Sequence, residues 1–178
     1  MKNHVIQLLD STFVDSIIAL QDLCWHCDNK IFTKSRRETY LLSFQADNFA
    51  LGITNEQGLI GFVTCTVQDD MSPKNLGREL GFGIEKLNMV SHVNTILIHP
   101  AHRRKGLGNL LLQSALKRFV QPTKYILTTI TPSNVPSRKL FEKNNFKLIK
   151  TFFINDDTKL LYGIGLVQDK EMEYVRPR

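Results

Sequence analysis

One stretch of the sequence, residues 96–116 (ILIHPAHRRKGLGNLLLQSAL), constrains the fold more than any other. It opens with an apolar run typical of a buried strand, which His99-Pro100 ends. Apolar residues at helical spacing follow the two glycines; they are Leu107, Leu111, Ala115 and Phe119. The stretch therefore predicts a strand that leads directly into a helix, as in an α/β protein.

The turn between this strand and this helix is basic and rich in glycine. Arg103, Arg104 and Lys105 stand directly before Gly106, and Gly108 follows. The first N–H groups of a helix have no partner within it, and the positive end of the helix dipole adds to their attraction for anions. Glycine lets phosphate oxygens approach the backbone. These residues predict a cradle for a pyrophosphate group.

Two common phosphate-binding motifs do not fit this turn. A P-loop needs Lys and Ser or Thr after its last glycine, whereas Lys105 precedes Gly106 and Asn109 follows Gly108. A dinucleotide fingerprint needs a third Gly or Ala where this chain has Leu111, and it lies in an N-terminal parallel βαβ unit. Both motifs are excluded.

Hydrophobic periodicity and turn residues predict alternating strands and helices along the chain. Strands are predicted over residues 4–9, 49–54, 59–67, 93–98, 125–131, 146–154 and 159–166. Helices are predicted over 12–27, over 35–44 behind a Ser35–Glu38 capping box, from 107, and from Ser133 or Asn134 to Asn144. Residues 69–91 predict only a short helix without a defined place. We expect one domain over 1–167 and a polar tail over 168–178.

Two segments resemble motifs of one protein family. IHPAHRRKGLGNLLL resembles the acetyl-CoA motif of the GNAT superfamily of acyl-CoA N-acyltransferases, R/Q-x-x-G-x-G/A, with Arg103, Gly106 and Gly108 at its fixed places. TPSNVPSRKLFEKNNFKLI resembles the family's N-x-x-[AS]-x-x-L-Y-E-K-x-G-F segment. The matching residues are Asn134, Ser137, Leu140, Glu142, Lys143 and Phe146. Two motifs in the family's order make the resemblance specific.

The resemblance implies a splayed, mixed β-sheet flanked by helices, with acetyl-CoA as co-substrate and no metal. Acetyl-CoA would lie in the V between the strands at 93–98 and 125–131. Main-chain groups of Ile96, Leu97 and Ile98 would pair with its pantetheine arm, and an N–H there would polarise the thioester carbonyl. The other cofactor-binding residues implied are Arg103, Arg104, Lys105, Gly106, Leu107, Gly108 and Asn109 at the pyrophosphate, and Asn134, Ser137 and Phe141 at the thioester.

The same resemblance implies an N-acetyltransferase in which a primary amine attacks the thioester directly. The sequence does not identify the acceptor. A small molecule is slightly favoured over a protein amine, because residues 69–91 could close over a compact pocket. Phe141 stands where the family usually has Tyr, which motivates a second hypothesis, an acyl-CoA-binding sensor or inactive relative.

Proton transfer is the least defined part of this chemistry. The acceptor amine is mostly ammonium at neutral pH and needs a base. His92, at the start of the 93–98 strand, is the first candidate; Glu79, Glu85 and a water chain are alternatives. The family's Tyr commonly protonates the departing thiolate. With Phe141 in its place, that proton would come from Ser137, Tyr125, Tyr162 or water.

Composition and charge limit the classes of binding partner that we expect. The sequence is 42% hydrophobic and 22% charged, which is usual for a globular protein. No apolar run reaches the roughly 18 residues of a membrane span, and no secretory signal is visible, so we expect a cytoplasmic protein without a membrane partner. Twenty-three Lys and Arg against 17 Asp and Glu favour anionic ligands. A nucleic-acid-binding module is a third, less favoured hypothesis, and a homodimer would suit the family.

Cys24 and Cys27 form a C-x-x-C pattern, which occurs in redox-active cysteine pairs and as half of a zinc site. No second pair of ligands follows at the spacing of a structural zinc site. Both residues continue the apolar stripe of the predicted helix 12–27, so we expect them in the core.

Overall fold

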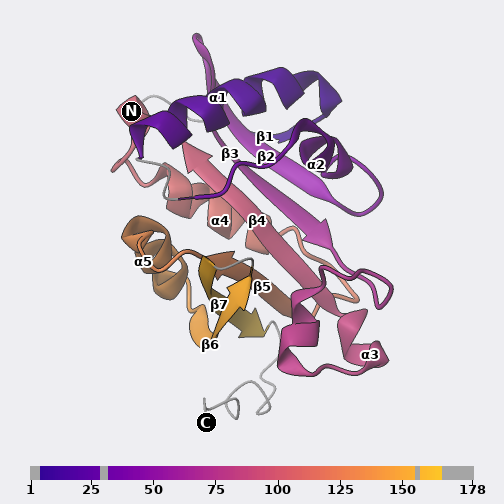
Figure 1. Ribbon diagram of the computed structural model, residues 1–178. Coiled ribbons are helices and arrows are strands. Elements are labelled where there is room, and N and C mark those ends of the chain that lie inside the picture. Colours follow the sequence, from indigo (N-terminus) through magenta and orange to yellow (C-terminus); the bar gives the residue numbers. More distant parts are fainter. Residues whose placement is uncertain (1–4, 29–31, 155–156, 166–178) are drawn as a thin grey trace. The chain divides into compact units, whose positions relative to one another are not determined.

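The structure is a computed structural model that describes residues 5–28, 32–154 and 157–165 (Figure 1). Its helices, with η for short 3-10 helices, are η1 (Ser11–Phe13), α1 (Val14–Cys27), α2 (Arg37–Leu42), η2 (Leu76–Leu80), α3 (Ile84–Leu87), η3 (Pro100–His102), α4 (Leu107–Leu116) and α5 (Val135–Lys143). Its strands are β1 (Ile6–Leu9), β2 (Phe49–Asn55), β3 (Gly58–Val67), β4 (Val90–Ile98), β5 (Tyr125–Ile130), β6 (Lys147–Ile154) and β7 (Asp157–Gly165). The predicted tail lies outside the described residues, as do positions 4 and 166 of the predicted strands. Within the described ranges, no helix is long and apolar enough to cross a membrane.

The seven strands are hydrogen-bonded in the order β1-β2-β3-β4-β5-β7-β6. β4 and β5 are parallel, whereas β1–β2, β2–β3, β5–β7 and β6–β7 are antiparallel. The parallel pairing joins Val90–His92 to Tyr125–Leu127. This mixed sheet with helices on it confirms the predicted fold class.

The chain divides into two compact units. The first consists of Met1–Thr66 and Asn94–Arg118, and the second of Val67–Val93 and Phe119–Arg178. β4 passes from the second unit into the first between Val93 and Asn94. The expectation of a single domain over 1–167 stays a prediction.

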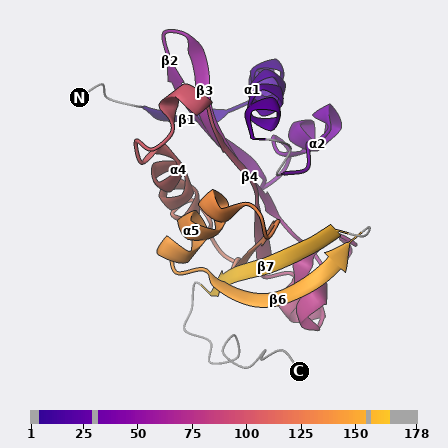
Figure 2. The same cartoon turned by 60° about the vertical axis from the view of Figure 1, so that its left-hand side comes forward.

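In the first unit, helices cover both faces of the sheet. Figure 2 shows α1 and α2 on one side of β1–β3 and α4 on the other. Leu97 of β4 belongs to the core under α1, together with Ile17, Leu20 and Phe62. The predicted stripe of α4 is buried at Leu107, Leu111 and Ala115. This packing fixes the end of β4 and the start of α4, the two ends of the predicted cradle.

In the second unit, the segment between β3 and β4 packs on the sheet. Leu76, Leu80, Phe82 and Met89 contact a core formed by Val90, Tyr125, Leu127, Ile149, Phe152 and Leu161. The next residue of β7, Tyr162, points to the other face and reaches Glu142 of α5. The sheet of this unit is therefore covered by η2 on one face and α5 on the other.

β4 starts earlier than predicted, at Val90 instead of residue 93. The polar residues Ser91 and His92 are buried, which the apolar pattern alone did not anticipate. Each finds a partner inside the protein: the Ser91 hydroxyl lies 2.8 Å from the Thr123 hydroxyl, and His92 Nε2 accepts from the Leu76 N–H at 3.1 Å. Hydrogen bonding removes the cost of burying them.

The predicted capping box at Ser35 and Glu38 is wrong, because α2 begins at Arg37. The backbone of Ser35 is instead held by the buried side chain of Gln21 of α1. The Ser35 N–H donates to Gln21 Oε1 at 2.7 Å, and Gln21 Nε2 donates to the Ser35 carbonyl at 3.0 Å. A partner distant in sequence thus replaces the local cap.

Asn75 organises residues 69–91, which hold both η2 and α3. Its side chain is buried and donates to the carbonyl oxygens of Asp69 and Leu87, each at 2.9 Å. Its Oδ1 accepts from the Gly77 N–H at 2.9 Å and caps η2. One amide therefore ties three points of the segment together.

The two cysteines of the C-x-x-C pattern differ. Cys24 is fully buried, as expected, whereas Cys27 is exposed, so the prediction of a core position is wrong for Cys27. Cys27 stands at the last turn of α1, where the covered stripe of the helix ends. In the described part of the chain, no three His, Cys, Asp or Glu residues are grouped as a metal site.

Candidate active site

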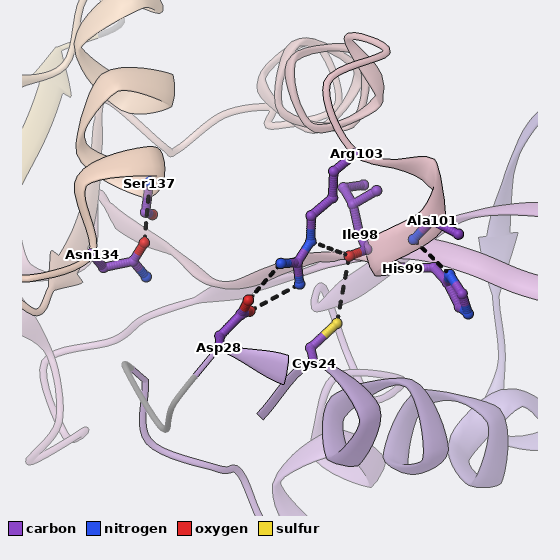
Figure 3. Close-up of polar contacts among 8 residues, drawn as sticks. All are labelled: Cys24, Asp28, Ile98, His99, Ala101, Arg103, Asn134 and Ser137. Atoms are coloured by element: carbon purple, nitrogen blue, oxygen red, sulfur yellow. Dashed lines mark hydrogen bonds and ion pairs between the residues drawn. The ribbon is translucent and has the colours of Figure 1, made fainter. Parts of the chain in front are cut away.

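The predicted cradle begins where β4 ends and η3 turns the chain. The His99 N–H donates to the carbonyl of Ile60 in β3 at 2.8 Å, which fixes the last bond of the strand. The His99 side chain then caps η3, its Nδ1 accepting from the Ala101 N–H at 3.2 Å, and Pro100 occupies the first position (Figure 3). His99 therefore shapes the turn that leads into the loop.

Arg104 and Gly106 adopt left-handed backbone conformations, with φ of 59° and 79°. Gly106 is the N-cap of α4, and no side chain of the described residues caps this helix. A Cβ at Gly106 would meet no atom of residues 5–28, 32–154 or 157–165 within 4 Å, so among these residues there is open space beside the backbone. Left-handed residues in a turn can orient neighbouring N–H groups toward one point, which is a geometry that binds anions.

The start of α4 offers further donors. Its first intrahelical hydrogen bond runs from the Leu110 N–H to the Gly106 carbonyl, at 3.0 Å. The amides of Leu107, Gly108 and Asn109 precede that bond and carry the positive end of the helix dipole. The structure thus brings the predicted residues 104–109 together at one helix terminus with room for a ligand.

Arg103 is used differently from the other basic residues of the loop. Its Nη1 and Nη2 contact Oδ1 and Oδ2 of Asp28 at 2.5 and 2.9 Å, and its Nε donates to the Ile98 carbonyl at 3.0 Å (Figure 3). The Asp28 carboxylate raises the pKa of the Arg103 guanidinium. Arg104 is exposed, and the Lys105 ammonium donates to the Ala101 carbonyl at 3.2 Å.

The three β4 residues predicted to pair with pantetheine are not equivalent. The Leu97 carbonyl lies on the β3 side, 3.3 Å from where a Cβ of Gly61 would stand. The Ile98 carbonyl accepts from Arg103 and also from the Cys24 thiol, whose sulfur is 3.5 Å away. Because strand residues alternate, the main chain of Ile96 points to the same side as that of Ile98, away from β3.

In the second unit, Asn134, one of the two predicted caps, caps α5. Its Oδ1 accepts from the Ser137 N–H at 3.2 Å (Figure 3). Phe141 is buried and packs edge-on against Phe146, with 4.9 Å between ring centroids. Asn145 stands where the family's segment has Gly; it takes a left-handed conformation with φ of 65°, which is common at the end of a helix.

His92 is not at the start of a strand but inside β4, where only 6% of it is exposed. Burial lowers the pKa of its imidazole to about 4. Its Nε2 accepts from the Leu76 N–H, so this lone pair already holds η2 in place. These surroundings describe a neutral histidine that positions the segment before β4.

The two carboxylates considered as alternative bases are exposed. Glu79 of η2 pairs with Lys150 of β6, with 3.0 Å between Oε2 and Nζ. Glu85 lies in the first turn of α3. Both side chains are therefore open to solvent.

The tyrosines considered as acids are engaged within the second unit. The Tyr125 ring is buried against Phe82, with 4.9 Å between centroids. The Tyr162 hydroxyl donates to Glu142 at 2.7 Å, and its pKa is raised by burial and by this carboxylate. Ser137 is half-buried in the first turn of α5, and its hydroxyl has no such partner among the residues that the structure describes.

Comparison with known proteins shows the family of the chain. The sequence matches the model of the acetyltransferase (GNAT) family over residues 15–146, which contain the loop, α4 and α5. The chain belongs to this family. The GNAT protein is therefore an acetyl-CoA-dependent N-acetyltransferase, with acetyl-CoA as co-substrate and an amine as acceptor.

Solved structures of acetyltransferases share its fold. NAA60 from Arabidopsis thaliana, in complex with acetyl-CoA, has a TM-score of 0.71 at 14% identity, covering 92% of this chain and 99% of that one. The Escherichia coli ribosomal-protein-S18-alanine N-acetyltransferase has a TM-score of 0.69 at 14% identity, covering 95% and 97%. Diaminobutyrate acetyltransferase EctA from Paenibacillus lautus has 0.65 at 19%, covering 92% and 95%. Comparison with curated protein sequences gives no match.

Sequence reasoning missed Asp28 and Cys24 as parts of this site. Asp28 follows the predicted helix 12–27 directly, but it is 75 residues from Arg103, and no local pattern links them. The periodicity predicted a buried Cys24 without its contact to the Ile98 carbonyl. Only the packing of α1 on β4 reveals either role.

Proposed function

We propose that this GNAT protein transfers the acetyl group directly from acetyl-CoA to the primary amine of a small molecule, and that the loop before α4 binds the pyrophosphate. The observation that supports the binding site is the left-handed backbone at Arg104 and Gly106, ahead of a helix that has no side-chain cap in the described part of the chain. Backbone amides in this arrangement suit phosphate oxygens.

The chain's own groups fit this ligand. Open space at Gly106 accommodates a phosphate against the backbone, and Arg104 and Lys105 supply positive charge beside it. Acetyl-CoA would supply an activated thioester. The N–H groups of Ile96 and Ile98, on the side of β4 away from β3, would orient the pantetheine arm and stabilise charge on the thioester oxygen.

We propose Ser137 as the group near the thioester that assists the leaving thiolate, since Tyr125 and Tyr162 are engaged elsewhere. A thiol with a pKa near the ~8.5 of free cysteine leaves readily, so the aid required is small. Asn134 and Phe141 stay as predicted neighbours of the thioester. Asn134 caps the helix that carries Ser137, and Phe141 anchors that helix in the core.

We propose the same three candidates, His92, Glu79 and Glu85, for the base that receives the amine proton. The buried position of His92 argues for a positioning role, while Glu79 and Glu85 are accessible to solvent. The pH dependence of kcat/KM in His92→Gln, Glu79→Gln and Glu85→Gln separates them. Loss of the acidic limb of the profile identifies the base, and three unchanged profiles leave water as the proton carrier.

The small-molecule acceptor is proposed from the segment before β4. Residues 69–91 are folded and anchored by Asn75 and His92, as expected for a part of the chain that shapes a pocket. Among the solved relatives, the Escherichia coli enzyme acts on a ribosomal protein and EctA on diaminobutyrate. The family therefore accommodates both acceptor classes. We also propose a homodimer and a cytoplasmic location.

Thermal unfolding with acetyl-CoA, coenzyme A, ATP and NAD tests the binding site. Acetyl-CoA or coenzyme A at 100 times its Kd should stabilise the protein by about 2.7 kcal/mol, whereas ATP and NAD should not. Thiol release with a panel of small amines and N-terminal peptides then identifies the acceptor class. Stabilisation without turnover on any amine would favour the acyl-CoA-binding sensor instead.

A further inference from the structure

We propose that Arg103 and Asp28 are positioning residues, which set the course of the loop before α4, and that Arg103 does not itself bind the phosphates. This inference rests on the proposed binding of acetyl-CoA at residues 104–109. It differs from the role that the motif suggests for its first basic residue, which is to add charge at the pyrophosphate.

The guanidinium group of Arg103 is occupied by the protein itself. Each of its three nitrogens has a partner: Nη1 and Nη2 contact the two Asp28 oxygens, and Nε donates to the Ile98 carbonyl (Figure 3). A planar guanidinium bound in this bidentate way has a defined orientation. To reach a phosphate, Arg103 would have to give up these contacts.

The charge of Arg103 is also compensated. Asp28 lies against it with a side chain that is only 17% exposed, and the Arg103 side chain is 34% exposed. A partly buried carboxylate in direct contact cancels most of the field of the cation. Arg104 and Lys105, both exposed, carry the positive charge that the loop presents to solvent.

The pair joins three elements that the proposed site requires. Asp28 is the C-cap of α1, Ile98 ends β4, and Arg103 begins the loop whose next residue, Arg104, is left-handed. The Ile98 carbonyl accepts from both Arg103 and Cys24, so the end of the strand is fixed from two sides. Loss of the pair would release the loop at the point where its N–H groups are oriented.

A set of variants distinguishes positioning from phosphate binding. We expect Asp28→Asn and Arg103→Gln each to raise the Kd of acetyl-CoA on the order of tenfold, measured by calorimetry on the full chain. The double variant should bind acetyl-CoA no more weakly than the weaker-binding single variant, because both substitutions remove the same interaction. Arg103→Lys keeps the charge but loses the planar guanidinium that pairs with both Asp28 oxygens. It should therefore lose as much affinity for acetyl-CoA as Arg103→Gln.

Asp15→Asn is the matched control. It removes the carboxylate of another Arg–Asp pair in the first unit, Asp15–Arg37, which is exposed and involves the first turn of α1, whereas Asp28 is the C-cap of that helix. Its acetyl-CoA affinity should equal that of the wild type. Lys105→Gln is the electrostatic control: it should reduce the dependence of Kd on ionic strength, whereas Arg103→Gln should leave that dependence unchanged.

The outcomes separate this inference from the proposed function. If the wild type does not bind acetyl-CoA, the proposed function fails and the inference falls with it. If the wild type binds and Asp28→Asn binds equally or more tightly, the freed Arg103 contacts phosphate and the positioning role is refuted. Retained affinity in Arg103→Lys contradicts it in the same way. Should Arg103→Gln fail to fold by circular dichroism, the Asp28→Asn and Arg103→Lys results still decide.

Discussion

Gly106→Ala should separate the stability of the loop from its function. The variant adds a methyl group in open space, so packing is not disturbed. The cost lies in the backbone, since φ is +79° and an L-residue in this conformation loses about 1 kcal/mol. For a chain of this size, that corresponds to a fall in Tm of roughly 2–4 °C.

Gly81→Ala is the matched control for this substitution. Gly81 ends η2 with φ of +70°, and a Cβ there would also meet no atom within 4 Å. The two variants should therefore lose a similar free energy of unfolding. Gly106 differs in standing at the proposed pyrophosphate site, where relaxation of its backbone would turn the amides of residues 106 and 107 away from the ligand.

Urea unfolding and calorimetric titration with acetyl-CoA measure the two quantities. We expect equal losses of stability in both variants, but a Kd about 10- to 100-fold higher in Gly106→Ala alone. That range corresponds to one hydrogen bond to a charged group, worth about 1.5–3 kcal/mol. Equal acetyl-CoA affinities in the two variants would refute the assignment of the loop backbone as the phosphate site.

Three further predictions concern the second unit. The His92 imidazole has its pKa lowered from 6.5 to about 4 by burial, so the unfolded chain binds the extra proton between these values. Its contribution to stability is complete above pH 6.5 and is lost as the pH falls toward 4, about 2 kcal/mol between pH 7 and 5. His92→Gln, which keeps an acceptor for the Leu76 N–H, should flatten this dependence in urea unfolding; an identical pH dependence would contradict it. Asn75→Ala should cost about 3 kcal/mol of unfolding free energy by leaving two carbonyls and one N–H without their partner, and a loss below 1 kcal/mol would show that water replaces the amide. Phe141→Tyr restores the family's residue and should not raise kcat, because position 141 is buried against Phe146; a several-fold rise in thiol release would show that its hydroxyl reaches the thioester.

Local sequence patterns were sufficient to predict those turns, strands and helix ends that are determined by residues close together in the sequence. The strand-to-helix turn at 98–107 is visible in the sequence because glycine, proline and basic residues meet there between two apolar runs. The hairpin of β2 and β3 follows from alternation around a short turn. The Asn134 cap and the left-handed Asn145 follow from the preferences of asparagine at helix ends.

Features that depend on distant partners could not be predicted. Ser91 and His92 are polar residues of a kind that is common in loops. They can lie inside β4 because Thr123 and Leu76 are their hydrogen-bond partners. Ser35 looks like a helix cap until Gln21 is seen to hold its backbone. Arg103 carries the motif, but its contact with Asp28 exists only because α1 packs beside the end of β4.

Asn109→Asp tests most directly the claim that the start of α4 binds the pyrophosphate of acetyl-CoA. The change is isosteric and places a negative charge in the first turn, where it favours the helix by about 0.3–1 kcal/mol. A phosphate bound at this helix terminus would be repelled by about 1–3 kcal/mol. Gln113→Glu adds the same charge one turn later, on an exposed position of the same helix. Calorimetric titration should give a Kd at least about fivefold higher for Asn109→Asp than for Gln113→Glu, without loss of stability. Equal Kd values in the two variants would contradict the account.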